Sequence, residues 1–438
     1  MAEMISFNYT LAKAIWASLE KQGLEPRKDA VGIISCRFSQ EELDMVTSLQ
    51  LTDVTSLKGI SKLKNLKYLS VSCSQRTAYT PPENLRAIES VDVFEIEKLS
   101  NLEHLTIDNQ PFLYGIDISR FPKLQTLTLT RNENLEEVIG LAENRTLYEL
   151  TFYSQNNISS LPGLDKFIVE NPNLSELRLD VLLYPSAIGY NPVTGKINQT
   201  ALDRITNDFP YAKWSESILT KTIDINNYQM GKLHSSALEI VSKYCPKGCS
   251  DLVSVAAVDR WLAENVTYNH AALDSSFRGV SKGGIVYGPI GGANGAYDAL
   301  IHKTCVCEGY TRAMQYMLAL KGIKTANTHC ISGKDKYHMS EKPEPNSIRF
   351  YTLPESDFHS ICRIERDSGC YYCDSCWDAG HFQRGDTSLP YLLLTKEQIS
   401  KDHALSFYEQ NISHQNPIPD YVRTATKSVV EQTFNKSK

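Results

Sequence analysis

The stretch Asn101-Leu102-Glu103-His104-Leu105-Thr106-Ile107 recurs along the first half of the chain and decides its fold. Close copies are Asn65–Val71, Lys123–Leu129, Thr146–Phe152 and Asn173–Leu179. Each is close to the pattern L-x-x-L-x-L, with Val, Ile or Phe sometimes in the last place, and successive copies are 36, 22, 23 and 27 residues apart. One such unit cannot bury its leucines alone, so the units are expected to stack into one continuous core.

This pattern resembles leucine-rich repeats, whose period is about 20–29 residues. The resemblance covers roughly a third of the chain and implies a solenoid of parallel strands in the α/β class. Alternate strand positions, among them Tyr68, His104 and Arg178, would form a polar concave surface. That surface is expected to bind a partner protein, or else the repeats are a rigid scaffold. The longer first step predicts an insertion within Ser72–Asp92.

Composition narrows the function classes. The chain has 438 residues, 42% hydrophobic content and a formal net charge of −6, which disfavours nucleic-acid binding. No run of about 18 apolar residues predicts a membrane span, and the first residues do not resemble a signal peptide. Eleven cysteines, an odd number, favour free thiols in a reducing compartment, either the cytoplasm or a host cytosol. The sequence does not indicate an oligomeric state.

A candidate nucleophile lies in the stretch Thr304-Cys305-Val306-Cys307-Glu308-Gly309-Tyr310-Thr311. Apolar residues at helical spacing follow it and predict a helix that begins at Cys307 and ends near Gly322. The first-turn N–H groups of a helix favour a thiolate over a thiol. Cys307 is therefore preferred over Cys305 as the nucleophile.

A base and an orienting acid follow in a predicted hairpin. Phe358–Ile364 alternates like a strand, and Cys370–Asp374 is a second strand-like run after a turn. The start of the first strand lies opposite the end of the second, so His359 and Asp374 should be neighbours. The prediction is a triad with Cys307 as nucleophile, His359 as base and Asp374 as orienting acid. Other histidines, including His403, lack such a context.

These motifs resemble the transglutaminase-like fold among papain-like cysteine enzymes. Cys307-Glu308-Gly309-Tyr310 matches its nucleophile motif, Val-Cys-x-Gly-Tyr-Ala, and His359 and Asp374 follow in the family's order. The resemblance covers about residues 236–385 and implies Cys–His–Asp catalysis without a metal or cofactor. Ser360 stands where the family commonly has alanine. The second oxyanion donor is unassigned, with Tyr268 and Gln315 as candidates beside the Cys307 N–H.

A structural zinc site is the main alternative for the cysteines at the C-terminal side. Cys370, Cys373 and Cys376 have a ligand-like spacing, as do Cys245 and Cys249. Successive residues of a strand point to opposite faces, which argues against a zinc site at Cys370 and Cys373. No metal site is therefore predicted.

The predicted architecture has four parts: a helical cap (1–45), leucine-rich repeats (46–185), a linker (186–235) and a transglutaminase-like α+β domain (236–438). The predicted function is acyl transfer on protein carboxamide or peptide bonds through a thioester, as a protease, deamidase or transglutaminase. The alternative is a non-catalytic scaffold that binds a partner through the repeats. Repeats joined to such a domain are similar to effectors that bacteria secrete into host cells. The polar tail, Thr424–Lys438, is expected to fray.

Overall fold

The structure is a computed structural model that describes residues 4–75, 82–153, 157–209, 212–217, 222–272, 293–332, 358–366, 369–405 and 418–437. The chain divides into two compact units. The first comprises residues 1–179, 186–189 and 198–212, and the second comprises residues 180–185, 190–197 and 213–438. In the part of the chain that the structure describes, no helix is both long and apolar enough to cross a membrane.

The first unit alternates short strands with helical turns. Up to β10 its elements are β1 (Ile5–Ser6), α1 (Tyr9–Glu20), β2 (Arg37–Phe38), α2 (Gln40–Met45), β3 (Ser48–Thr52), η1 (Ile60–Lys62), β4 (Tyr68–Ser72), η3 (Pro82–Asn84), α3 (Ser90–Ile96), β5 (His104–Asp108), β6 (Gly115–Asp117), η4 (Ile118–Arg120), β7 (Thr126–Thr130), β8 (Glu137–Ile139), β9 (Glu149–Tyr153), α4 (Leu164–Glu170) and β10 (Glu176–Asp180). The predicted capping box of Ser39 and Glu42 begins α2.

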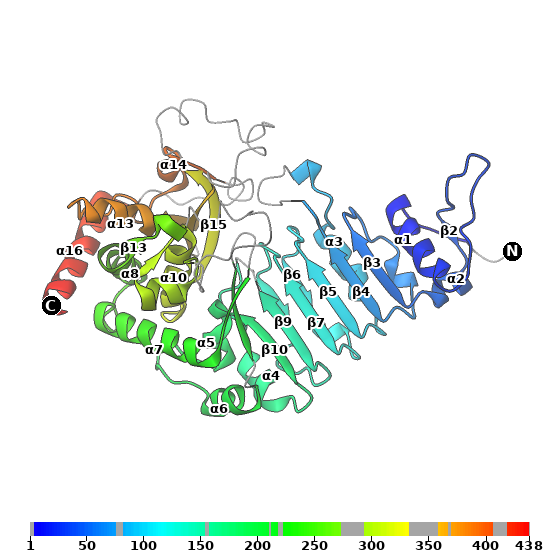
Figure 1. Cartoon of the computed structure of the whole chain (residues 1–438), viewed down its shortest axis with the longest axis horizontal. Helices are drawn as coiled ribbons and strands as arrows, with labels where there is room; N and C mark the ends of the chain where they lie inside the picture. The colour runs from blue at the N-terminus through cyan, green and yellow to red at the C-terminus, as the bar shows by residue number, and fades with distance from the viewer. Residues whose placement is uncertain are drawn as a thin grey trace. The chain divides into compact units, whose positions relative to one another are not determined.

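Each predicted recurrence of the leucine pattern contains a strand. The strands β3, β4, β5, β7, β9 and β10 pair in this order, all in parallel and in register (Figure 1). Their pattern leucines, such as Leu105 and Leu127, are fully buried, whereas Tyr68 at an alternate position is 47% exposed. This alternation of buried and exposed side chains is the one expected of stacked repeats that share one core. It makes the first unit a mixed α/β structure built on a parallel sheet.

The asparagine that begins a recurrence of the leucine pattern connects that recurrence to the preceding one. The side chain of Asn101 donates a hydrogen bond to the Lys64 carbonyl at 2.8 Å, and that of Asn173 donates to the Arg145 carbonyl at 2.8 Å. Such bonds satisfy backbone groups that the turns between strands leave without partners. The predicted insertion between β4 and β5 contains η3 and α3, and its residues 76–81 lie outside the described residues.

The remaining elements mostly belong to the second unit. They are η5 (Val181–Leu183), α5 (Tyr184–Ala187), α6 (Gln199–Asp208, in the first unit), β11 (Lys213–Ser217), β12 (Thr222–Ile225), α7 (Asn227–Tyr244), α8 (Asp251–Asn265), β13 (Thr267–Tyr268), η6 (Asp298–His302), β14 (Thr304–Cys305), α10 (Cys307–Ala319), β15 (Thr325–Ser332), β16 (Phe358–Arg366), β17 (Gly369–Cys373), α13 (Ser375–Gln383), α14 (Lys396–Ile399), β18 (His403–Leu405) and α16 (Asp420–Ser437).

The second unit packs helices against a small antiparallel sheet. The sheet has the strand order β17-β16-β15-β18, and α10 contacts both β15 and β16. Helices α8 and α13 pack against α10. The predicted hairpin is present, with Cys362 of β16 opposite Cys373 of β17, although the turn residues 367–368 lie outside the described residues. The helix predicted from Cys307 ends as expected, because Gly322 follows it with φ +72°.

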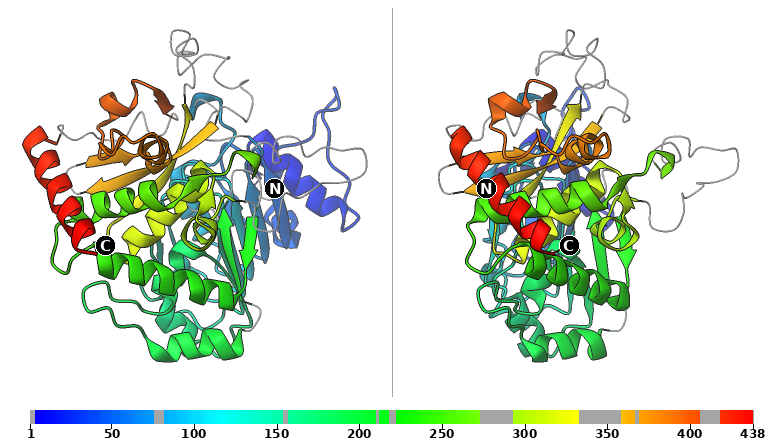
Figure 2. Two further views of the ribbon diagram at one scale, coloured as in Figure 1. Left: turned by 60° about the vertical axis from the view of Figure 1, so that its left-hand side comes forward. Right: turned by 90° about the vertical axis from the view of Figure 1, so that its left-hand side faces the viewer.

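The prediction of a frayed tail is wrong. Helix α16 spans Asp420–Ser437 and contacts α7 and α8, and it lies along this unit in both views of Figure 2. Val430 and Phe434 are buried, and the Phe434 ring packs on Tyr244 with 4.4 Å between centroids. The tail is polar in composition, but Val430 and Phe434 lie one helical turn apart and face the unit. The composition of the tail does not reveal this spacing, because it does not depend on the order of the residues.

Candidate active site

Cys307 is the first residue of α10, and the local sequence holds it there. Val306 is the N-cap and offers no side-chain hydrogen bond to the first turn, although its backbone carbonyl accepts the Gly309 N–H at 2.9 Å. A Cβ at Gly309 would come within 2.5 Å of Cys305 Cβ, so only glycine lets α10 pack this closely on β14. Tyr310 donates its hydroxyl to the Val266 carbonyl at 2.8 Å, which ties the helix start to the end of α8.

The two neighbouring thiols have different surroundings. Cys305 is fully buried beside Gly309, whereas Cys307 is partly exposed. A reagent or substrate can therefore reach Cys307 and not Cys305, in line with the choice made from sequence. All eleven cysteines of the chain are thiols.

His359 and Asp374 lie together, as the hairpin predicts. His359 is the second residue of β16, and Asp374 follows β17 as the N-cap of α13. The distance from His359 Nε2 to Asp374 Oδ2 is 2.8 Å. A hydrogen bond with the Cys307 side chain is among the causes that raise the pKa of the same imidazole. Since Nε2 faces Asp374, Nδ1 is the ring nitrogen left for the thiol, and the three predicted residues form one chain of contacts.

The charges of these groups reinforce one another. Burial lowers the pKa of His359, but the Asp374 carboxylate and Cys307 outweigh burial and raise it to about 10. Burial would raise the pKa of Asp374, but His359, followed by His403, holds it well below its ordinary value. The site therefore favours a carboxylate beside an imidazolium near neutral pH.

Asp374 is fixed from the α13 side as well. Its second oxygen, Oδ1, accepts a hydrogen bond from the Trp377 N–H at 3.1 Å, which is the N-cap bond of the helix. The next residue, Ser375, donates its hydroxyl to Asp259 of α8 at 2.6 Å. Both contacts orient the start of α13, so Asp374 Oδ2 is aimed at the histidine.

A buried polar network, which sequence reasoning missed, joins α10 to the sheet. Glu308 follows Cys307 directly and is 3% exposed. Its carboxylate accepts hydrogen bonds from Ser360 Oγ at 2.6 Å, Asn327 Nδ2 at 2.8 Å and Arg312 Nε at 3.1 Å. Ser360 is the residue after His359, so this one carboxylate links the neighbour of the thiol to the neighbour of the imidazole. Ser360 is therefore held by a buried carboxylate.

A second histidine, His403, also belongs to the site. The distance from its Nε2 to Asp374 Oδ2 is 3.0 Å, and its ring is fully buried. Sequence reasoning set His403 aside, and only the pairing of β18 with β15 brings it here. A histidine 29 residues beyond Asp374, outside any motif, carries no local signal of this contact.

The two candidate oxyanion donors, Gln315 and Tyr268, differ in their position relative to Cys307. Gln315 is eight residues beyond Cys307 on α10, about 12 Å along a helix axis, so its amide cannot reach a carbonyl attacked at Cys307. Gln315 is therefore wrong as a candidate. For Tyr268, burial and then the charge of Cys307 raise the pKa of the phenol. The Cys307 N–H and Tyr268 remain the predicted donors.

The only group of three that could hold a metal, among the residues that the structure describes, is His359, Asp374 and His403. Their ligand atoms lie within 4.8 Å of one another. The cysteines weighed as zinc ligands from the sequence, Cys370–Cys376 and Cys245 with Cys249, are not in such a group in that part of the chain.

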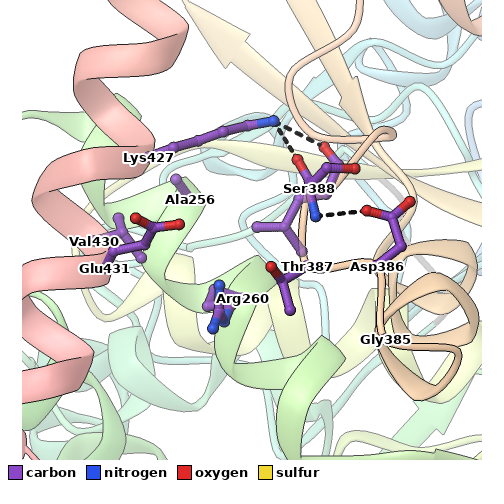
Figure 3. Close-up of a pocket in the computed structure, with 10 residues that line it drawn as sticks. Ala256, Arg260, Gly385, Asp386, Thr387, Ser388, Lys427, Val430 and Glu431 are labelled. Atoms are coloured by element: carbon purple, nitrogen blue, oxygen red, sulfur yellow. Dashed lines mark hydrogen bonds between the residues drawn. The ribbon is translucent and has the colours of Figure 1, made fainter.

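A cavity of about 300 Å³ lies elsewhere in the second unit, between α8, α16 and the loop after α13 (Figure 3). Its lining residues are Ala256, Arg260, Gly385, Asp386, Thr387, Ser388, Leu389, Lys427, Val430 and Glu431. Lys427 closes one side by donating hydrogen bonds to the Ser388 and Leu389 carbonyls. None of the predicted catalytic residues lines this cavity, so we do not assign it as the substrate site.

No protein-family model matches the chain. No curated protein matches it either. Similar solved structures include a TGase, with TM-score 0.25, 13% identity and coverage of 34% of this chain and 33% of that chain. A candidate cysteine protease from Cytophaga hutchinsonii has TM-score 0.21, 12% identity and coverage of 44% and 54%. Internalin C2 from Listeria monocytogenes has TM-score 0.21, 21% identity and coverage of 39% and 83%.

The match therefore spans about a third of the TGase chain and about half of the protease chain. Similarity at these scores does not define an activity.

Proposed function

We propose that the second unit is a cysteine-dependent acyl-transfer enzyme of the transglutaminase-like class, acting on protein carboxamide or peptide bonds. The observation that carries the proposal is the chain of contacts from Cys307 through His359 to Asp374, with the thiol at a helix N-terminus. This order of nucleophile, base and orienting acid is what an activated thiol requires.

The proposed reaction begins with attack by the Cys307 thiolate on the carbonyl carbon. The C–S bond forms, the C–N bond breaks, and the His359 imidazolium gives its proton to the leaving amine. Because the pKa of His359 is raised to about 10, the imidazolium that this step needs is retained at neutral pH. Water or an amine then attacks the thioester, His359 takes up a proton, and the C–S bond breaks to restore the thiolate.

Water as acceptor gives hydrolysis or deamidation, and a lysine amine gives cross-linking. We further propose that the parallel strands of the first unit form a leucine-rich-repeat solenoid that binds the protein substrate or a partner. The polar alternate positions support this role. One example is the stacking of Tyr68 on His104, with centroids 4.2 Å apart. A reducing compartment is proposed too, since the mechanism needs a free thiol.

The first prediction is that iodoacetamide labels Cys307 at pH 6 at least about tenfold faster than Cys36 or Cys249. All three cysteines are partly exposed, so Cys36 and Cys249 are internal controls for access. An ordinary thiol is only about 0.3% thiolate at pH 6, whereas a thiol paired with an imidazolium is mostly ionised. The lower intrinsic nucleophilicity of such a thiolate offsets part of the gain. Peptide mapping of the folded protein by mass spectrometry measures all three rates at once.

In the variant H359A, the Cys307 rate is expected to fall to the level of Cys36. If Cys307 in the folded wild-type protein reacts no faster than Cys36, the second unit is a non-catalytic fold and the chain is a binding scaffold. Mass changes on candidate substrate proteins then separate deamidation from cleavage and cross-linking.

A further inference from the structure

His403 lies between two carboxylates. Its Nδ1 is 2.7 Å from Asp402 Oδ1, and its Nε2 is 3.0 Å from Asp374 Oδ2. An ionised carboxylate only accepts hydrogen bonds, so each ring nitrogen must carry a hydrogen to make both contacts. A histidine with hydrogens on both nitrogens is a cation.

Both carboxylates favour the ionised form that this argument needs. The pKa of Asp374 is held well below its ordinary value by His359 and His403 against the effect of burial. Burial also acts to raise the pKa of Asp402, but hydrogen bonds from His403 and Tyr391 lower it. The Tyr391 hydroxyl donates to Asp402 Oδ2 at 2.7 Å.

Aromatic rings enclose the pair and keep water away from it. The Trp377 ring lies 4.5 Å from the His403 ring, and the Tyr391 ring packs edge-on against Trp377 at 5.0 Å. The side chains of His403 and Asp374 are 0% and 1% exposed. Charges in such surroundings interact strongly, and an unmatched one is costly.

We propose that His403 is a fourth, positioning member of the site: an imidazolium that bridges Asp402 and Asp374 and holds Asp374 as a charged acceptor aimed at His359. The proposal rests on the acyl-transfer function proposed above for Cys307. Two cations, His359 and His403, donate to the same Oδ2, while the Trp377 N–H holds Oδ1. The carboxylate then has no freedom to rotate away from His359.

Among the residues that the structure describes, five titratable groups face His403 directly or through His359. They are Asp374 before α13, His359 on β16, Asp402 before β18 and Tyr391 in the segment between α13 and α14, with Cys307 beyond His359. The facing residue of β15, in the register of the sheet, is Ser332. The charges therefore alternate from Cys307 outward to Asp402.

The direct test is the protonation of the His403 ring in the full chain at pH 8. Histidine side chains are labelled with ¹⁵N, and the His403 signals are identified by their loss in H403Q. An ordinary histidine is about 97% neutral at this pH. We expect N–H signals from both ring nitrogens of His403. A ring with one unprotonated nitrogen would overturn the proposal, whatever the reactivity of Cys307.

The functional test uses 4-nitrophenyl acetate as the acylating probe. H403Q and D402N are expected to lower kcat about 10- to 100-fold with little change in KM, because a charged hydrogen bond that orients Asp374 is lost. The matched controls are H381Q and D386N, a partly exposed histidine–aspartate pair at 2.9 Å that does not touch Asp374. They should react like the wild-type protein.

Three results separate the hypotheses. If the wild-type protein reacts and H403Q has the same kcat, the proposed role of His403 is wrong and the proposed function is unaffected. A wild-type protein that does not react sinks the proposed function, and the ring signals still report on His403. In a third result, stoichiometric Zn²⁺ blocks the labelling of Cys307 and removes the Nε2–H signals of both His403 and His359, and a chelator reverses both effects. This result would show a metal site in place of the bridge and would overturn the proposal.

Discussion

Replacing Asp374 by asparagine is expected to slow acylation of Cys307 by 4-nitrophenyl acetate by about 10⁴-fold, the size of effect known when a triad loses its orienting carboxylate. The reason lies in the His359 tautomer. Asp374 Oδ2 can only accept, so His359 must carry hydrogen on Nε2 and leave Nδ1 able to take the thiol proton. An asparagine amide can donate to Nε2 instead, which places the hydrogen on Nδ1 and removes the base.

The D374N variant is suited to this test because it keeps the N-cap of α13. Asparagine is as good an N-cap as aspartate, so the bond to the Trp377 N–H is preserved. Stopped-flow release of 4-nitrophenolate gives the acylation rate, and a thermal melt checks the fold. D386N, at the exposed pair with His381, is the matched control and should react at the wild-type rate. A loss of less than tenfold in D374N would contradict the triad.

The second large effect is on stability, and it concerns Glu308. We expect E308A to lower the free energy of unfolding by about 3–5 kcal/mol, the usual cost of breaking a buried ion pair on one side. Glu308 and Arg312 side chains are 4% and 1% exposed. Removing the carboxylate takes away the ion-pair partner that lies 3.1 Å from Arg312 Nε, and it removes an acceptor from both Ser360 and Asn327.

The control for E308A is E264A. Glu264 pairs with Arg260 at the same i,i+4 spacing on α8, but the two side chains are 20% and 14% exposed. A pair that water reaches is worth only about 0.5–1 kcal/mol, so E264A should cost no more than that. Urea unfolding measures both variants. Equal losses in the two would show that the Glu308 network is not a buried ion pair in solution.

The Glu308 network also bears on catalysis. Because Glu308 neighbours Cys307 and Ser360 neighbours His359, the bond between Glu308 and Ser360 limits how far the thiol and the imidazole can separate. In a population of E308A that remains folded, labelling of Cys307 should therefore slow. The bond also gives a physical reason for serine at the position where the related motif commonly has alanine.

Local sequence was enough to predict several parts of this molecule. The spacing of leucines predicted the strands of the first unit, because a period of two along a strand separates buried from exposed residues. The helix from Cys307 to its end near Gly322 followed from apolar spacing and a left-handed glycine. The approach of His359 to Asp374 followed from hairpin geometry, in which the start of one strand faces the end of the next.

Other parts depended on contacts between residues far apart in the chain. His403 reaches Asp374 only because β18 pairs with β15, and Glu308 meets Ser360 only because α10 packs on β16. Neither residue stands in a recognisable motif, since a polar side chain that is buried by distant elements leaves no period in its own neighbourhood. By itself the sequence determined the recurring leucine pattern, the helix that begins at Cys307 and the Cys307–His359–Asp374 prediction. The tertiary structure alone decided what holds that site in place, because burial and hydrogen-bond partners are set by packing.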